Sequence, residues 1–199
     1  GPNLPFVFIH INKCAGTSVG RAIGLPVKQH LTARDVIDRI GKPAWASAYR
    51  FTVVRNPWDK VVSHYKHRVA TNQTGLGDGS VPFSDWVRQT YGPDKNPRLY
   101  DNPKMFLPNV DWLKDHDGNV DIDLIGRFED LAGFYEAVSA RLGLQGGTLP
   151  HLNGTAKTDY RAAYDAATAE WVGAWFAEDV TRFGYTFDPR PAAGPVTSG

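Results

Sequence analysis

The sequence predicts a mixed α/β fold with a doubly wound, mainly parallel sheet flanked by helices. Three short runs, at 6–11, 49–54 and 120–125, have the apolar and β-branched composition of strands. A segment with helical spacing follows each of them. Strands that alternate with helices favour a parallel sheet, and such a sheet binds ligands at the carboxyl ends of its strands.

The first two helices are expected on the N-terminal side of the second strand. After a small polar loop at 12–18, helical spacing continues to Ile23. Thr32 and Asp35 have the spacing of a capping box and predict the start of a second helix. Gly41 and Pro43 predict its end.

The later helices are expected at 57–69, 84–91, 131–142 and 166–183. Asn56 before a proline predicts the start of the first of these, and Ser84 is the predicted cap of the next. The last is expected as one continuous helix with an aromatic stripe that faces the core.

Two segments, 71–82 and 92–108, are rich in Gly, Pro, Asn and Asp. Loops of that length are uncommon unless they serve binding, so these two segments are the candidate substrate-contacting loops. The chain is expected to form a single domain over 3–188, because 42% hydrophobic residues in 199 suffice for one core. The Pro-, Ala- and Gly-rich tail at 189–199 is expected to be disordered.

The charge and cysteine content exclude several classes of function. With 22 basic and 21 acidic residues the net charge is +1, so no nucleic-acid partner and no stable membrane anchor are expected. Cys14 is the single cysteine, which excludes an internal disulfide. These features predict a cytoplasmic protein, although Gly1 and Pro2 resemble a cleavage scar and an N-terminal truncation of a longer precursor stays open.

The loop after the first strand has the composition of an anion site. Backbone N–H groups at the start of a helix attract anions, and Lys13 adds a full positive charge. Gly16 lets the backbone approach an oxyanion, and the hydroxyls of Thr17 and Ser18 are hydrogen-bond donors. An ordinary helix start, with Thr17 as the cap and Lys13 in solvent, is the alternative that this segment leaves open.

A second anion-binding residue follows the second strand. Arg55 stands where a P-loop phosphotransferase needs an acidic residue to hold magnesium, and the guanidinium suits a phosphate instead. Ser63, on the helix that follows, is placed to complete this second phosphate site. No metal is expected to be required. A strand, a phosphate-binding loop and a helix in this order predict a P-loop-like fold. In this loop, however, the lysine precedes the glycine, whereas the loop of nucleotide kinases has the glycine directly before the lysine.

Residues 8–18, Phe-Ile-His-Ile-Asn-Lys-Cys-Ala-Gly-Thr-Ser, and residues 51–65, which begin Phe-Thr-Val-Val-Arg-Asn-Pro-Trp, together resemble two motifs of one family. The family is that of the sulfotransferases that use 3′-phosphoadenosine 5′-phosphosulfate (PAPS). The resemblance is to the group that includes carbohydrate sulfotransferases of the heparan sulfate 2-O-sulfotransferase type. Segments 125–131 and 183–187 are similar to further parts of that family.

The resemblance implies roles for the residues of both motifs. The 5′-phosphosulfate would be held by the loop Lys13, Cys14, Ala15, Gly16, Thr17 and Ser18. The 3′-phosphate would be held by Arg55 and Ser63. Arg161 lies in a segment that resembles a part of the family that approaches the nucleotide, with a surface ion pair as its alternative. The donor would be PAPS, the product adenosine 3′,5′-bisphosphate, and the acceptor a hydroxyl-bearing small molecule or carbohydrate.

Sulfuryl transfer also calls for a base at the acceptor, and His30 is the candidate. Lys13 and His30 are thus the predicted catalytic residues, with a surface-loop histidine as the alternative for His30. His10 is expected in the core, and His64 with His67 on a half-exposed helix face rather than at a metal. A P-loop nucleotide phosphotransferase and a non-catalytic nucleotide-binding module remain the alternative functions.

Overall fold

The computed structural model describes residues 2–25, 29–144 and 159–188. These residues form two compact units, each described below by itself. The first contains the described residues within 1–55 and 109–156, and the second those within 56–108 and 157–190. The single domain expected over 3–188 remains a prediction, and the tail expected to be disordered lies outside the described residues.

The first unit contains a three-stranded parallel sheet in the order β1 (Phe6–Ile9), β2 (Tyr49–Val54) and β3 (Leu124–Arg127). Phe8 is in register with Phe51, and Val54 with Arg127. All three strands therefore end at the same edge of the sheet. The parallel α/β sheet predicted from the sequence is confirmed.

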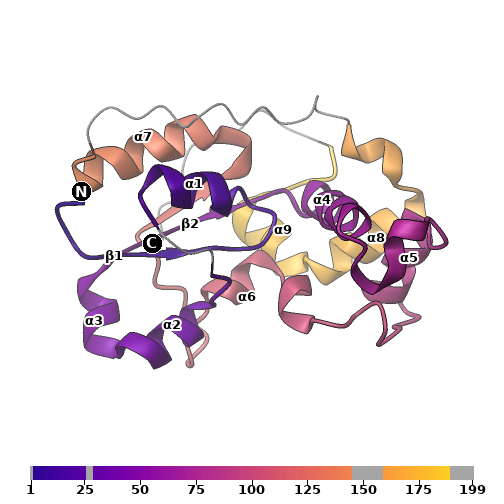
Figure 1. The fold of residues 1–199 in the computed structure, drawn as a ribbon, viewed down its shortest axis with the longest axis horizontal. Helices are drawn as coiled ribbons and strands as arrows, with labels where there is room; N and C mark the ends of the chain where they lie inside the picture. Colours follow the sequence, from indigo (N-terminus) through magenta and orange to yellow (C-terminus); the bar gives the residue numbers. More distant parts are fainter. Residues whose placement is uncertain (1, 26–28, 145–158, 189–199) are drawn as a thin grey trace. The chain divides into compact units, whose positions relative to one another are not determined.

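Helices cover the sheet of the first unit on two sides. In Figure 1, α1 (Gly16–Ala22) and α7 (Leu131–Leu142) lie on one side, and α2 (Ala33–Ile40), α3 (Lys42–Ser47) and α6 (Asn109–Leu113) on the other. A short 3-10 turn, η3 (Phe128–Asp130), joins β3 to α7.

Aromatic packing holds α7 against the sheet. The ring of Phe134 lies so close to Gly126 that a Cβ added to this glycine would stand 2.2 Å from it. The same ring is 6.1 Å from that of Phe51, which is fully buried in the central strand. The glycine in β3 is therefore explained by close helix packing.

The second unit is helical. It contains α4 (Pro57–Ala70), α5 (Phe83–Thr90), α8 (Ala166–Trp175) and α9 (Ala177–Phe183), with 3-10 turns η1 (Gln73–Asp78), η2 (Pro103–Phe106) and η4 (Tyr160–Ala163). Aromatic side chains dominate its core, with Trp58, Trp86, Tyr91, Phe106 and Phe176 all buried. None of the described helices has the length and apolar content required to cross a bilayer.

Several helix boundaries agree with the sequence. Thr32 and Asp35 form the predicted capping box of α2. Asn56 caps α4 by accepting hydrogen bonds from the N–H groups of Trp58 and Asp59. α7 covers 131–142 as expected, and Gly143 follows it in the left-handed conformation.

The predicted end of α2 is confirmed, because Gly41 is its C-cap, whereas the further helix α3 that follows was not predicted. Pro43 lies in the first turn of α3, where its missing N–H is harmless. The predicted start of the third strand is wrong. The third strand begins at Leu124 rather than at residue 120, and Val120 forms only an isolated bridge with Lys114. The intervening Asp121 and Asp123 instead form ion pairs with Arg50 of β2.

Two predictions in the second unit are also wrong. Ser84 is not a cap, because Pro82 takes the N-cap position of α5 in an extended conformation. The helix expected over 166–183 is interrupted at Phe176, whose ψ of 25° departs from helical geometry while its ring is fully buried. Tertiary packing has therefore overridden helical periodicity at this position.

Candidate functional site

The loop between β1 and α1 is tightly wound. Lys13 has a φ of 62° and Ala15 a φ of 60°, so two residues with side chains adopt the left-handed conformation. Each such residue costs about 1–2 kcal/mol relative to a right-handed conformation. Alternation of this kind curls backbone N–H groups towards one centre, which is a common architecture for anion binding. Strain at this loop is therefore consistent with a binding role.

The first turn of α1 directs backbone N–H groups out of the helix. Ala15 is the N-cap, and no side chain caps the turn. The amides of Gly16 and Thr17 lie in the first turn, where no intrahelical acceptor exists. Thr17 lies inside the helix and is not its cap, so the alternative of an ordinary threonine-capped start does not describe this structure.

Gly16 is required by His10, the residue that follows β1. A Cβ at this position would lie 1.7 Å from Cδ2 of the His10 ring, which is itself 7% exposed. His10 is thus buried, as expected. The glycine was predicted to allow close approach of an oxyanion, whereas in the structure the space beside its Cα holds the imidazole of His10.

His30 lies against His10. Their ring centroids are 4.4 Å apart, and Nδ1 of His30 is 3.1 Å from the backbone carbonyl oxygen of His10. Because a carbonyl only accepts, Nδ1 of His30 carries the hydrogen, and the lone pair of the neutral ring is on Nε2. A partly buried imidazole fixed in one tautomer is a competent proton acceptor.

Arg55, directly after β2, reaches back to the loop after β1. Its Nη1 donates a hydrogen bond to the carbonyl oxygen of Lys13 over 2.8 Å. Its Cζ lies 3.8 Å from the ring centroid of Phe128, a cation–π contact that fixes the plane of the guanidinium. The two residues that the sequence assigned to separate phosphates are therefore in direct contact.

Asn109, the first residue of α6, lies between the two strand-end segments. Its Oδ1 accepts from Sγ of Cys14 at 3.6 Å, and its Nδ2 donates to the backbone carbonyl oxygen of Arg55 at 3.1 Å. Asn109 is fully buried and Cys14 is 1% exposed. Since its thiol is committed to this contact, Cys14 would face a ligand through its backbone.

The sequence matches the profile of the sulfotransferase family over residues 2–186, which is most of the chain and includes both units. The chain belongs to the sulfotransferase family. Neither a search of curated proteins nor a search of solved structures gave a match. Family membership supports sulfuryl transfer as the general activity and identifies the chain as a transferase.

The second unit of this sulfotransferase contains Ser63 and Arg161, two further residues that the sequence predicts to bind the sulfuryl donor. Ser63 lies on α4 and is partly buried. Its joint use with Arg55 remains a prediction, because the two residues lie in different units.

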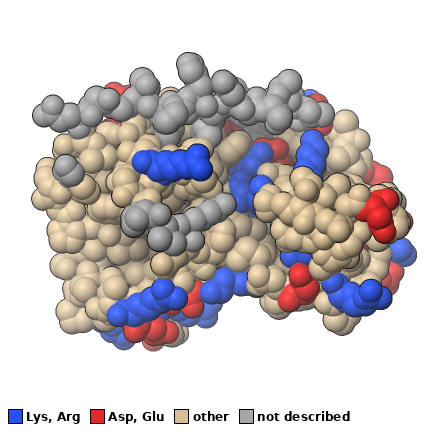
Figure 2. Space-filling view, in the orientation of Figure 1, with Lys and Arg blue, Asp and Glu red and all other residues tan. Residues whose placement is uncertain are grey.

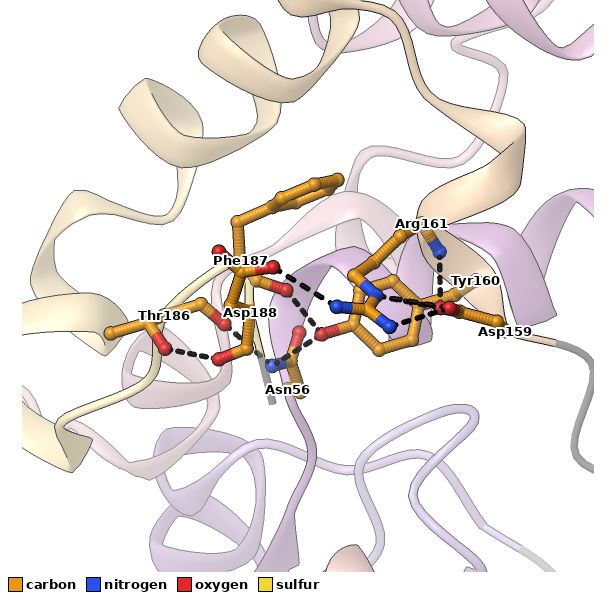
Figure 3. Close-up of polar contacts among 7 residues, drawn as sticks. All are labelled: Asn56, Asp159, Tyr160, Arg161, Thr186, Phe187 and Asp188. Atoms are coloured by element: carbon orange, nitrogen blue, oxygen red, sulfur yellow. Dashed lines mark hydrogen bonds and ion pairs between the residues drawn. The ribbon is translucent and has the colours of Figure 1, made fainter. Parts of the chain in front are cut away.

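Arg161 is held by two carboxylates, as Figure 3 shows. Its Nη2 is 2.7 Å from Asp159, and its Nη1 is 3.1 Å from Asp188. Hydrogen bonds from Arg161 hold the pKa of Asp159 below its usual value. In this structure Arg161 therefore forms the surface ion pair that was the alternative to nucleotide binding. A phosphate would have to displace one of these two carboxylates.

The segment that carries Arg161 is anchored beside the start of α4. The hydroxyl of Tyr160 donates to the carbonyl oxygen of Phe187 at 2.5 Å, and Nδ2 of Asn56 donates to that of Thr186 at 3.0 Å (Figure 3). Burial, followed by the charge of Asp59, raises the pKa of Tyr160 to about 12, so its hydroxyl stays protonated at neutral pH.

Several aromatic and histidine side chains outside the two motifs have structural positions. Trp86, Trp112 and Tyr91 are buried core residues. His64 is not half-exposed but 4% exposed, and its Nε2 accepts from Nε of Arg68 at 2.9 Å. Over the described ranges, no group of three or more His, Cys, Asp or Glu side chains is placed to hold a metal ion.

Sequence reasoning missed Asn109 and Phe128. Asn109 directly follows the 92–108 loop and shares the composition of that loop, so nothing marked it as different. Phe128 does lie in the segment that resembles the family, and an aromatic residue just after a strand was the available signal. Its contact with Arg55 required the fold to be known.

Proposed function

We propose that this chain transfers a sulfuryl group from PAPS to an acceptor hydroxyl. The observation that carries the proposal is the contact between Arg55 and Lys13, which joins two cationic residues at neighbouring strand ends. A donor with phosphate groups at its 3′ and 5′ positions needs two such cations at a fixed separation. The family match supports sulfuryl transfer in general.

The residues of the first unit fit the donor. The wound loop offers the amides of Gly16 and Thr17 beside Lys13, as the 5′-phosphosulfate requires. Arg55 is assigned to the 3′-phosphate, for which a planar guanidinium provides paired donors. Ser63 and Arg161 are the further candidates for the donor site.

When bound, PAPS supplies a sulfuryl group on a phosphate leaving group. Lys13 would stabilise the negative charge that grows on the oxygens around the transferred sulfur. His30 would accept the proton of the acceptor hydroxyl on Nε2, since its Nδ1 is committed to the carbonyl of His10. In this reaction, the bond between the sulfur and the phosphate oxygen would break and a bond between the sulfur and the acceptor oxygen would form. The proton of the acceptor hydroxyl would move to the imidazole.

A carbohydrate hydroxyl is our first candidate for the acceptor, from the resemblance to carbohydrate sulfotransferases. The loops at 71–82 and 92–108 are its expected contacts, because loops rather than the recognisable motifs determine specificity in most enzymes.

A cytoplasmic location remains the expectation from composition. Basic and acidic side chains both occur on the face drawn in Figure 2, in keeping with the net charge of +1.

The experiment is a transfer assay with ³⁵S-labelled PAPS over saccharides, phenols, lipids and peptides. We expect label on at least one hydroxyl-bearing class with the wild-type chain and none with Lys13→Ala. Binding of PAPS without transfer to any class would favour the non-catalytic module. Phosphate transfer from ATP with magnesium would instead support the phosphotransferase.

A further inference from the structure

The side chain of Asn109 connects the two segments that carry the proposed donor-binding residues. One oxygen and one nitrogen of the same amide are used: Oδ1 accepts from the thiol of Cys14, and Nδ2 donates to the carbonyl oxygen of Arg55. Arg55 in turn donates to the carbonyl oxygen of Lys13. The contacts form a closed ring that runs from Lys13 and Cys14 through Asn109 to Arg55.

The helix that carries Asn109 is firmly held. In α6, the side chains of Val110, Trp112 and Leu113 are all fully buried, as is Asn109 itself. A buried amide that makes both kinds of hydrogen bond is costly to replace, because an apolar substitute leaves both partners unsatisfied. The position of Asn109 is therefore set by the core and not by the loop that it contacts.

We propose that Asn109 is a positioning residue of the donor site: it holds the backbone of Arg55 and the loop at Cys14 at a fixed separation, and so sets the spacing of the two phosphate-binding cations. The inference rests on the proposed function and deepens it. Because Asn109 is fully buried, we assign it no direct contact with the donor and an effect that is transmitted through Arg55. Its removal should therefore weaken donor binding only while the guanidinium of Arg55 is present.

The test is calorimetric binding of adenosine 3′,5′-bisphosphate to the full chain and to Asn109→Ser. We expect the Kd to rise about tenfold, which is the usual scale of coupling through a shared hydrogen-bond network. In an Arg55→Ala background, the same substitution should change the Kd by less than about threefold. Val138→Ala is the matched control, since Val138 is a fully buried residue of α7 in the same unit. It should lower the melting temperature and leave the Kd unchanged.

A Kd unchanged in Asn109→Ser, or an equal loss with and without Arg55, would overturn the inference while leaving the proposed function intact. If Asn109→Ser does not fold, Asn109→Asp decides in its place, since it keeps the size and the acceptor but removes the donor to Arg55. Failure of the wild-type chain to bind the bisphosphate would overturn the proposed function and this inference together.

Discussion

The guanidinium of Arg55 donates a hydrogen bond from Nη1 to the backbone carbonyl oxygen of Lys13, over 2.8 Å. The same group lies on the ring of Phe128, with Cζ 3.8 Å from the centroid. Both contacts belong to the chain itself. The orientation of the guanidinium is therefore established before any ligand arrives, and preorganisation of this kind reduces the entropic cost of binding.

Arg55→Lys tests the geometry of this group separately from its charge. Lysine keeps the positive charge but loses the planar donor array and the stacking on Phe128. We expect affinity for adenosine 3′,5′-bisphosphate to fall by about 1.5–3 kcal/mol, the scale of a charge-assisted hydrogen bond. The measurement is calorimetry. Arg34→Lys, at an exposed position of α2, is the control and should bind as the wild type does.

Gly16→Ala tests the packing of His10 on the phosphosulfate loop. The new Cβ would lie 1.7 Å from the buried ring, so ring or loop must move, and overpacking of this kind costs about 1–3 kcal/mol. Thermal or urea unfolding measures the loss. Gly20→Ala in the same helix is the matched control, because its Cβ would meet nothing nearer than 3.9 Å. That change should leave stability equal or higher, and equal losses in the two variants would contradict the account.

His30→Gln tests the proposed base. We expect kcat to fall by about 10²–10⁴, the usual contribution of general base catalysis. The KM of the variant for PAPS should change little, because His30 is assigned to the acceptor and not to the donor. His116→Gln, at an exposed histidine paired with Asp38, should keep the wild-type kcat. A kcat in His30→Gln equal to that of the wild type would remove His30 from the mechanism.

The ion pairs of Arg50 predict acid-sensitive stability. Burial acts to raise the pKa of Asp123, but the hydrogen bonds and charge of Arg50 outweigh it, so the pKa lies below its usual value. A carboxylate with a lowered folded-state pKa stabilises the fold above its unfolded pKa and loses that contribution as the pH falls through the folded value.

Asp123→Asn should therefore reduce the free energy of unfolding by about 1 kcal/mol near neutral pH, a modest figure because the side chain is partly exposed. In strong acid the two proteins should converge. Urea unfolding across a pH series measures this difference. Asp117→Asn, at an exposed position in the same unit, should run parallel to the wild type at every pH.

The sequence was informative where local chemistry determines structure. Thr32 and Asn56 are caps because their side chains accept hydrogen bonds from nearby N–H groups, and the pattern is visible over three residues. The buried strand at 49–54 was visible from the apolar and β-branched composition of its own residues. Contacts between distant residues were not visible. Residues 120 to 123 do not form the predicted strand, because Asp121 and Asp123 form ion pairs with Arg50.

The candidate site shows the same division. The loop at Lys13 and the arginine after β2 were recognisable as motifs, since their chemistry is local. The use of Asn109 depends on α6 being packed against both segments, 95 residues from one and 54 from the other. Thr17 does not cap α1, because Ala15 adopts a left-handed conformation at the N-cap and the helix begins at Gly16.

Calorimetry with adenosine 3′,5′-bisphosphate, with and without magnesium, tests the central claim most directly. Tight binding by the wild-type chain that does not depend on magnesium, and a large loss of affinity in both Lys13→Ala and Arg55→Ala, is the result that the account predicts. Binding at wild-type affinity after either substitution, or a preference for ATP with magnesium over the bisphosphate, would contradict it.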